Sequence, residues 1–151
     1  MKNSTASSGF TLIELLVTIV IIGVLAGLAI PSYFNSVRKS NRTEATVALS
    51  EAAQQLQKCY TVYGAYNSNS CLFYKTSFVD SPQKIITGKG YYQITISNPP
   101  NSDPKTTFTL TATAILAPQT KDIAACQKLT LTQNGTKGDA TSTATSPTTC
   151  W

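Results

Sequence analysis

The sequence contains no histidine, and this absence excludes several kinds of chemistry. Without an imidazole there is no Cys/His zinc site, no Cys–His nucleophile and no Ser–His relay. Acidic residues are also few, 7 in 151 residues. Those beyond residue 30 form no paired motif for acid–base work and no Asp-x-Asp cluster for calcium. We therefore expect no enzymatic activity, no metal site and no cofactor.

The chain lacks any long run of basic residues. It carries 12 Lys+Arg against 7 Asp+Glu, for a formal charge of +5, and the cations are spread along the chain. This mild basicity permits an encounter with an acidic polymer but does not by itself indicate one.

Charge is almost absent from the segment 10–30, where Glu14 is the only charged residue among 21. About 20 apolar residues suffice to cross a bilayer as a helix. Residues 1–9 are small and polar, with one lysine, and are typical of a leader peptide. A carboxylate inside such an apolar segment is costly unless it has a partner.

Three hypotheses account for this N-terminal region. The first is a signal peptide cut after Ala29, which leaves Glu14 unexplained, and the second is an uncut single-span anchor. In the third, cleavage after Gly9 makes Phe10 the new N-terminus, so that its amine lies four residues from Glu14. We favour the third, because it pairs two charges that are each costly alone. If many such helices pack together, the Glu14 of one can also meet the Phe10 amine of the next and set the register of assembly.

Helix breakers are rare up to Tyr63. Gly23, Gly27 and Pro31 are the exceptions, and they predict a softened or kinked stretch near the end of the apolar part, although ordinary membrane-helix packing explains them equally well. Over 31–63, apolar residues at steps of three and four predict an amphipathic helix that packs on a domain and is capped by Gly64. This apolar stripe comprises Ala45, Ala48, Leu49, Ala52, Ala53, Leu56 and Tyr60.

The remaining residues, 64–151, are expected to form an α+β head in which an antiparallel β-sheet packs on the long N-terminal helix. Residues 64–90 are typical of a loop, and three alternating runs within 91–133 predict strands with one face on the helix. The tail from Asn134 to Pro147 is too poor in apolar residues to pack by itself. The residues expected to face the helix are Tyr92, Ile94, Ile96, Phe108, Leu110, Ala112, Ala114, Leu129 and Leu131.

Four cysteines follow the apolar segment, and none forms a CxxC pair. An even number behind a membrane signal indicates two disulfides formed outside the cytoplasm. Three pairings are open to four cysteines, and sequence alone does not choose among them. We favour Cys59 with Cys71 and Cys126 with Cys150, since each bridge then closes a local loop.

The N-terminal third carries a specific motif, G-F-T-L-I-E at 9–14, followed by an apolar helix, Pro31 and an amphipathic extension. This pattern resembles the type IV pilin family and the related type II secretion pseudopilins. The resemblance implies the type IV pilin fold, cleavage after Gly9 by a prepilin peptidase, methylation of the Phe10 amine, and neutralisation of a neighbour's amine by Glu14. It also implies a single-pass inner-membrane protein with a periplasmic head, which the pilus assembly machinery adds to other pilin subunits in a fibre on the cell surface.

The second half is similar to PilE-type minor pilins and to the DNA-receptor pilins related to them. The likeness lies in TFTLTAT at 107–113, in DIAACQKLTLTQNGTKG at 122–138 and in the terminal pair Cys150-Trp151. It implies a four-stranded sheet and a bridge between the last two cysteines that bounds a C-terminal region over 126–151. The alternating pattern itself shows three strands.

These patterns lead to two main hypotheses and one variant. The first is a structural subunit of a type IV pilus, a minor pilin assembled through its helix, with Glu14 and Pro31 as assembly residues. The second is a DNA-uptake receptor whose head binds DNA through Lys121, Lys128 and Lys137, although a solvated lysine face explains the same residues. A type II secretion pseudopilin is the variant of the first. The sequence leaves open whether the fibre serves twitching motility, cell adhesion or DNA uptake.

Overall fold

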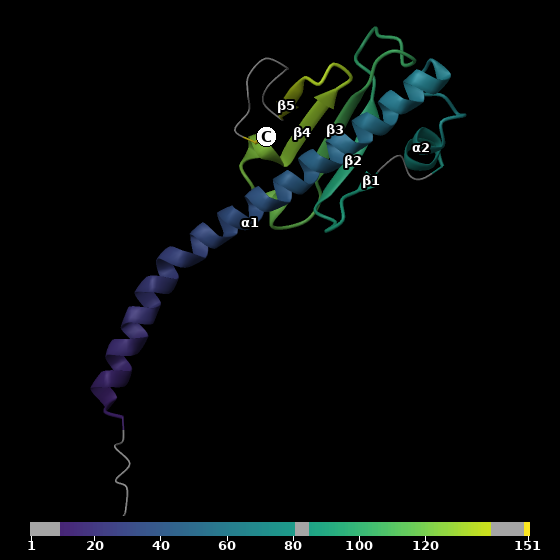
Figure 1. The fold of residues 1–151 in the computed structure, drawn as a ribbon. Helices are drawn as coiled ribbons and strands as arrows, with labels where there is room; N and C mark the ends of the chain where they lie inside the picture. The colour runs from purple at the N-terminus through teal and green to yellow at the C-terminus, as the bar shows by residue number, and fades with distance from the viewer. Residues whose placement is uncertain (1–9, 81–84, 140–149) are drawn as a thin grey trace, which may run out of the picture. The chain divides into compact units, whose positions relative to one another are not determined.

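The computed structural model describes residues 10–80, 85–139 and 150–151 (Figure 1). The chain divides into two compact units, with the division between Ser36 and Val37.

The first unit holds the apolar part of helix α1, which runs from Leu12 to Tyr63. No residue in 10–36 is buried, and large apolar side chains such as Leu12 and Leu28 are 80% and 74% exposed. The helix includes a stretch long and apolar enough to cross a membrane. Pro31 lies inside the helix, where it removes one backbone donor without ending the element.

The second unit begins with the amphipathic part of α1. Its buried residues follow one another at steps of three and four, which places them on a single face of the helix. Gly64 follows the last helical residue with φ of +69°, and its N–H donates to Tyr60 O at 2.8 Å. A glycine in this left-handed conformation ends helices without a Cβ penalty. The buried residues of α1 are Asn41, Ala45, Leu49, Ala52, Leu56 and Cys59.

A five-stranded antiparallel sheet packs on this face of α1, and its strand order is β1-β2-β3-β4-β5. The strands are β1 (Ile85–Ile86), β2 (Tyr92–Ser97), β3 (Thr109–Ala114), β4 (Lys128–Thr132) and β5 (Lys137–Asp139). The elements confirm the predicted α+β class, a long N-terminal helix with an antiparallel sheet (Figure 1).

The two faces of the sheet differ as their period-two alternation predicts. Ile94, Ala112 and Leu129 are paired across β2, β3 and β4, and all three are fully buried against the helix. The opposite face carries hydroxyls, because Thr95, Thr111 and Thr130 form the next cross-strand row. On that face the flanking rows are Gln93, Thr113 and Lys128 on one side and Ser97, Thr109 and Thr132 on the other.

The sheet has five strands, whereas the alternating pattern predicted three and the pilin resemblance implied four. One of the additional strands is β5. It lies inside the segment that we expected to be too polar to pack. The strand forms because its ladder needs backbone groups only, and the turn before it is closed by Gly135 with φ of +77°. Residues 140–147 of that segment lie outside the described residues.

The segment 64–90 also contains more structure than the predicted loop. A turn of helix, α2 (Leu72–Tyr74), is continued by a π-helical turn, Lys75–Val79, and the two-residue strand β1 follows. The segment is tied to the end of α1 by a disulfide between Cys59 and Cys71. Its buried anchor is Phe78, which is 3% exposed. The disulfide at Cys71 and the buried ring of Phe78 anchor residues 71–78 on the head.

Candidate functional site: the helix start and the disulfide-bounded region

Thr11 and Glu14 together cap the start of α1. The Glu14 carboxylate accepts hydrogen bonds from the Thr11 N–H at 3.0 Å and from the Thr11 hydroxyl at 2.8 Å, and the Glu14 N–H donates back to that hydroxyl at 3.3 Å. This reciprocal arrangement is a capping box, which satisfies two backbone donors that have no partner inside the helix. Glu14 therefore has a local role at the helix start that the charge argument alone missed.

The signal for this cap is present in the sequence as Thr-x-x-Glu immediately before an apolar run. It adds to the processing hypothesis and does not replace it, since Phe10 directly precedes the capping threonine. Gly9 lies outside the described residues. The structure therefore places Phe10 and Glu14 at the same helix end, and cleavage and methylation remain predictions.

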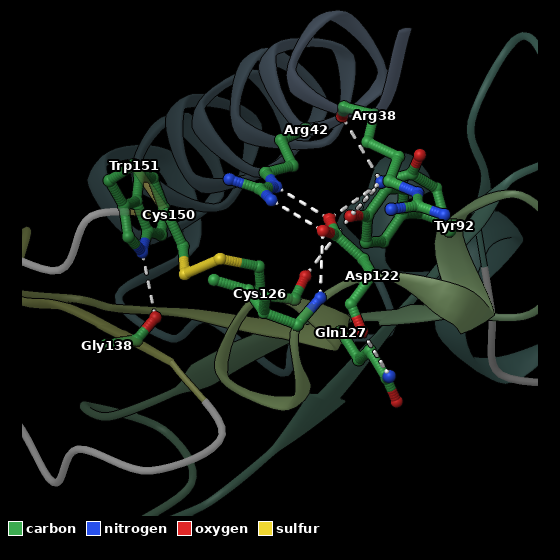
Figure 2. Close-up of a disulfide and its surroundings, with 11 residues drawn as sticks. Arg38, Arg42, Tyr92, Asp122, Cys126, Gln127, Gly138, Cys150 and Trp151 are labelled. Carbon is green, nitrogen blue, oxygen red and sulfur yellow. Dashed lines mark hydrogen bonds and ion pairs between the residues drawn. A yellow bond between two sulfur atoms is a disulfide. The ribbon is translucent and has the colours of Figure 1, made fainter. Parts of the chain in front are cut away.

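The C-terminal region is bounded by a disulfide between Cys126 and Cys150, which are 24 residues apart (Figure 2). Both cysteines are buried, at 0% and 3% exposure. Trp151 lies against the edge strand, where its indole N–H donates to Gly138 O at 2.8 Å. The Lys137 ammonium stands 5.0 Å from the centre of the Trp151 ring, within range of a cation–π contact. Cys150 is thus held by Cys126, and Trp151 is held by Gly138 and Lys137 of β5.

An ion pair joins α1 to the segment that precedes this disulfide. Arg42 donates from Nε to Asp122 Oδ2 at 2.7 Å and from Nη2 to Oδ1 at 2.6 Å, a bidentate arrangement (Figure 2). The side chain of Asp122 is 3% exposed and that of Arg42 is 17% exposed. The Ile123 N–H also donates to Asp122, at 2.9 Å. A pair this well shielded from water is held by several hydrogen bonds as well as by charge.

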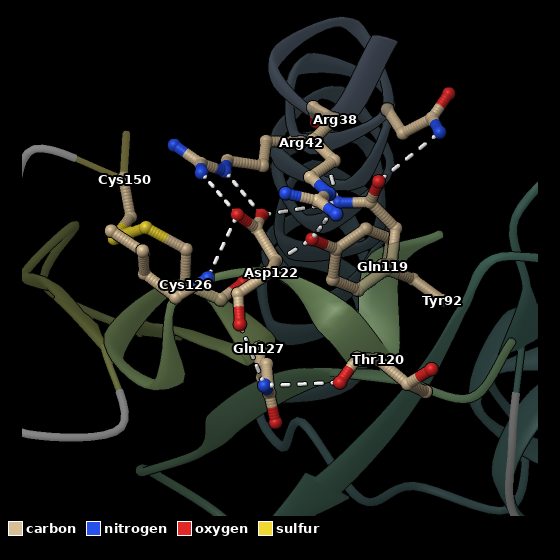
Figure 3. A network of polar contacts seen from close by, with 11 residues as sticks. Arg38, Arg42, Tyr92, Gln119, Thr120, Asp122, Cys126, Gln127 and Cys150 are labelled. Carbon is tan, nitrogen blue, oxygen red and sulfur yellow. Dashed lines mark hydrogen bonds and ion pairs between the residues drawn. A yellow bond between two sulfur atoms is a disulfide. The ribbon is translucent and has the colours of Figure 1, made fainter. Parts of the chain in front are cut away.

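Gln119 extends the ion pair into a buried polar network (Figure 3). Its amide nitrogen donates to the Tyr92 hydroxyl at 2.9 Å and to the Arg38 carbonyl at 3.3 Å, and its amide oxygen accepts from Asn41 Nδ2 at 3.2 Å. The Tyr92 hydroxyl donates onward to the carbonyl of Cys126 at 3.2 Å. The network therefore links α1, β2 and the disulfide through side chains that are almost completely buried.

The ionisation of this network follows from its contacts. Burial alone would raise the pKa of the Asp122 carboxyl, but the hydrogen bonds from Arg42 and Ile123 and the charges of Arg42 and Arg38 hold the pKa below its usual value. The hydrogen bond to Asp122 raises the pKa of Arg42. Burial raises the pKa of the Tyr92 phenol. Asp122 is therefore ionised and Tyr92 neutral at physiological pH, as their hydrogen bonds require.

The structure brings together two of the three lysines that we predicted as DNA contacts. The side-chain amide of Gln127 donates to the carbonyls of Thr120 and Asp122 (Figure 3). These two residues flank Lys121 in the sequence. Lys128 follows Gln127 directly and lies on the hydroxyl face of the sheet, opposite Thr113. Lys121 and Lys128 thus belong to the same corner of the head.

Lys137 lies on the other face of the sheet. It is paired across the strands with Leu131, whose side chain is buried against the helix, and cross-strand partners point to the same face. The predicted triad is therefore split between two faces at the β4–β5 edge. The sequence could not predict that the three lysines lie on different faces, because the alternating apolar pattern did not indicate β5.

Sequence reasoning missed a second group of cations, in the segment RKSNR at 38–42. The network places this segment against Gln119 and Asp122, beside the corner that holds Lys121. Arg38 lies close enough for its charge to lower the pKa of Asp122. The short basic run itself indicated this group in the sequence. The sequence did not indicate that Arg42 pairs with Asp122, which is 80 residues away.

The cysteine, aspartate and glutamate side chains in the described ranges 10–80, 85–139 and 150–151 form no group of three or more that could hold a metal ion. Both disulfides take up the cysteines there, and Asp122 is occupied by Arg42. The chemistry that this part of the chain offers is hydrogen bonding and positive charge.

Comparison with known proteins gives two family matches. Residues 31–130 match the model described as "Type IV minor pilin ComP, DNA uptake sequence receptor", and residues 4–30 match the "Prokaryotic N-terminal methylation motif". The first match spans all of α1 from Pro31 onward and the sheet as far as the third residue of β4.

Several curated pilins are similar to the chain. It is 30% identical over 95 residues to the type IV major pilin protein PilE1 of Neisseria gonorrhoeae, covering 63% of this chain and 42% of that relative. It is 29% identical over 123 residues to the type IV major fimbrial protein FimA of Dichelobacter nodosus, covering 74% and 78%. Alignments with PilE1 sequences span 42 to 55% of those relatives, about half their length.

Among solved structures, a type IV pilin from Shewanella oneidensis is similar to the chain, with 21% identity, a TM-score of 0.47 and coverage of 76% of this chain and 97% of that one. The family match over residues 31–130 and the methylation motif over 4–30 agree with the capped apolar helix and the sheet that packs on it. The chain belongs to the type IV minor pilin family, in the branch described as ComP, DNA uptake sequence receptor.

Proposed function

We propose that this chain is a minor subunit of a type IV pilus whose head binds double-stranded DNA. The observation that carries the proposal is the match of residues 31–130 to a minor pilin family described as a DNA uptake sequence receptor. That match lies over the head and the helix on which it packs. The charges and hydroxyls of the head support the same conclusion.

The positive charge of the described head is concentrated around the disulfide-bounded region. In the segments 38–42, 119–139 and 150–151, six Lys and Arg side chains stand against two carboxylates, an excess of four. In the other described residues of the head, 43–80 and 85–118, four lysines balance four carboxylates. The electrostatic attraction between the head and DNA phosphates would therefore be strongest at the region around the Cys126–Cys150 disulfide.

The cations of this region differ in their availability. Arg42 is engaged by Asp122, whereas Lys39, Lys121 and Lys128 are exposed. Lys128 stands at the end of a face rich in threonine hydroxyls, and such hydroxyls donate to phosphate oxygens as lysines do. Lys121 and Lys128, with the hydroxyl face beside them, are the contacts that we infer for the DNA backbone.

Salt-dependent binding tests this proposal. The full chain in detergent micelles is titrated into fluorescent duplex DNA at several salt concentrations, and the slope of log affinity against log salt is measured. Each phosphate contact contributes a slope of about −0.9. Replacing Lys121 or Lys128 by alanine should reduce the slope by about 1 and weaken binding to all duplexes alike.

Lys58→Ala is the matched control, since Lys58 is an exposed lysine of α1 in the region where charges balance. This variant should bind as the parent chain does. Binding that is absent at low salt, or that is equally weakened by Lys58→Ala, contradicts the proposal.

The N-terminal unit supports assembly into a fibre. Its apolar surface is exposed over the whole segment 10–36, and the methylation motif covers residues 4–30. We propose that a prepilin peptidase cuts after Gly9, that Phe10 is methylated, and that the exposed helix then moves from the inner membrane into contact with other pilin subunits. Glu14 would cap its own helix and meet the amine of a neighbour, and the head would reach the cell surface with the pilus.

A further inference from the structure

A small hollow lies between the segment 64–80 and the end of β2. Its volume is about 160 Å³, and aromatic rings and neutral polar groups line it. The rings belong to Tyr66, Tyr74 and Phe78, and the polar side chains to Asn67, Ser97 and Asn98. No charged side chain contributes to the lining within the part of the chain that the structure describes.

The apolar wall of the hollow is fixed by its own contacts. Tyr66 is stacked on Tyr60 at 4.6 Å, meets Phe108 edge-on at 4.8 Å, and donates from its hydroxyl to Gln57 Oε1 at 3.1 Å. Phe78 is buried at 3% exposure. These contacts order the wall before any ligand binds. Binding therefore costs little side-chain conformational entropy.

The polar side of the hollow has unused hydrogen-bonding capacity. Among the described residues, the side chains of Asn67, Asn98 and Tyr74 make no hydrogen bond, and none of the three is buried. Each asparagine offers two donors and one acceptor, and the tyrosine hydroxyl offers one of each. The Ser97 hydroxyl donates to Thr109 O at 3.4 Å and keeps its acceptor capacity. Groups of this kind orient a ligand in a pocket whose walls are otherwise apolar.

The size and charge of the hollow restrict the ligand. Pockets for drug-sized molecules measure roughly 300 to 1,000 Å³, whereas a cavity of about 150 Å³ holds a single six-membered ring. A lining without charge offers nothing to a phosphate or a carboxylate, which disfavours a nucleotide. Only Tyr74 presents a half-buried ring, because both other rings are buried. The ligand that fits is one uncharged ring with an apolar face and several hydroxyl or amide groups around it.

We propose that this hollow binds one residue of a neutral saccharide. The apolar face of the sugar ring packs on Tyr74, and its hydroxyl or acetamido groups hydrogen-bond with the amides of Asn67 and Asn98. The chain would then carry a glycan contact that is separate in its chemistry from the cationic region around the disulfide. Loss of DNA binding and loss of sugar binding are therefore independent results.

The test uses the full chain in a zwitterionic detergent, because a detergent with a maltoside headgroup would compete for the site. The probes are the methyl glycosides of glucose, galactose, mannose, N-acetylglucosamine and N-acetylgalactosamine. The side-chain amide signals of Asn67 and Asn98 are followed by two-dimensional NMR during titration. At least one glycoside should shift both signals with saturation in the millimolar range, which is the affinity expected for a ligand of about a dozen non-hydrogen atoms.

Two variants locate the binding. Tyr74→Ala should weaken binding about fivefold, because it removes the ring on which the sugar packs. Tyr63→Ala removes an exposed tyrosine that does not line the hollow, and binding should stay unchanged. The proposal is overturned if no glycoside shifts the amide signals, if Tyr74→Ala binds as tightly as the parent chain, or if deoxynucleosides shift the signals and glycosides do not.

Discussion

Replacing Arg42 by alanine would leave the carboxylate of Asp122 buried without its cation. That carboxylate is 3% exposed, and the donors that remain are the Ile123 N–H at 2.9 Å and the Gln119 amide at 3.4 Å. Removing one partner of a buried, hydrogen-bonded ion pair costs about 3 to 5 kcal/mol, because the other charge stays behind in a poor environment. At about 4 °C per kcal/mol for a domain of this size, the melting temperature should fall by about 12 to 20 °C.

The loss should depend on pH in a defined direction. The pKa of Asp122 is lowered in the folded chain, so its contribution to stability is complete above the unfolded value, about 3.9, and is lost as the pH falls through the lower folded value. In Arg42→Ala, burial is no longer opposed by the cation and should raise the pKa of Asp122. The difference in the free energy of unfolding between the parent chain and Arg42→Ala should then be largest near pH 7. It should decrease as the pH falls and the Asp122 carboxylate is protonated.

The assay is the thermal unfolding of the full chain in detergent, followed by near-ultraviolet circular dichroism at pH 7 and at pH 4. Lys39→Ala is the matched control, since Lys39 is an exposed cation three residues earlier in α1. The change Arg42→Ala is also made in an Asp122→Asn chain, where no buried charge remains. There the loss of stability should be clearly smaller, because the arginine donates to an uncharged amide and its removal leaves no carboxylate unpaired.

Two results would refute this reasoning. A fall of less than about 4 °C in Arg42→Ala would show that the pair contributes no more than an exposed salt bridge. An equal loss in the Asp122→Asn background would assign the effect to packing of the arginine stem instead of to the ion pair.

Three further predictions concern other parts of the chain. Cys126→Ser should destabilise the head by about 3 to 4 kcal/mol, the loop-closure value for a bridge across 24 residues, and an unchanged melting curve would count against it. Tyr92→Phe should lower the free energy of unfolding by about 1 to 3 kcal/mol, because the Gln119 amide and the Cys126 carbonyl both lose a buried hydrogen-bond partner. A decrease below about 0.5 kcal/mol in thermal unfolding would contradict a stabilising role of the network. Glu14→Ala should leave cleavage intact but remove the chain from the pilus fraction sheared off cells, whereas normal incorporation would refute its role in assembly.

Elements with a clear period were predictable from the sequence. The buried face of α1 from Ala45 to Leu56 follows steps of three and four, and the buried residues of β2 to β4 follow steps of two. The positive φ of Gly64 agrees with its predicted place after the helix. These features are local, so a few neighbouring residues are enough to indicate them.

Features that depend on distant partners were not predictable in the same way. The strand β5 has three residues and no apolar pattern, and it exists because β4 offers a free edge. The pairing of Arg42 with Asp122 joins residues 80 apart, and nothing in either neighbourhood identifies the other. The sequence indicated that Lys121, Lys128 and Lys137 lie near one another in the C-terminal region, but it could not indicate that Lys128 and Lys137 lie on opposite faces of the sheet. Their contact with DNA stays a prediction.

The helix start shows a third situation, in which the signal was present and a different explanation was preferred. Thr11 and Glu14 have the spacing of a capping box, but the carboxylate was interpreted only through its charge. The local cap gives the Glu14 carboxylate partners within a single chain, and its pairing with the Phe10 amine of a neighbouring chain stays a prediction. Both roles require the same helix end.

Mass spectrometry of the mature N-terminus tests the central claim most directly. The chain is purified from the membranes and from the sheared pili of the cells that produce it, and its N-terminal peptide is sequenced. Processing as a type IV pilin predicts a chain that begins at Phe10 and carries one methyl group on the amine. A chain that begins at Ile30, or that keeps residues 1–9, would contradict assembly through a charged Phe10 and Glu14.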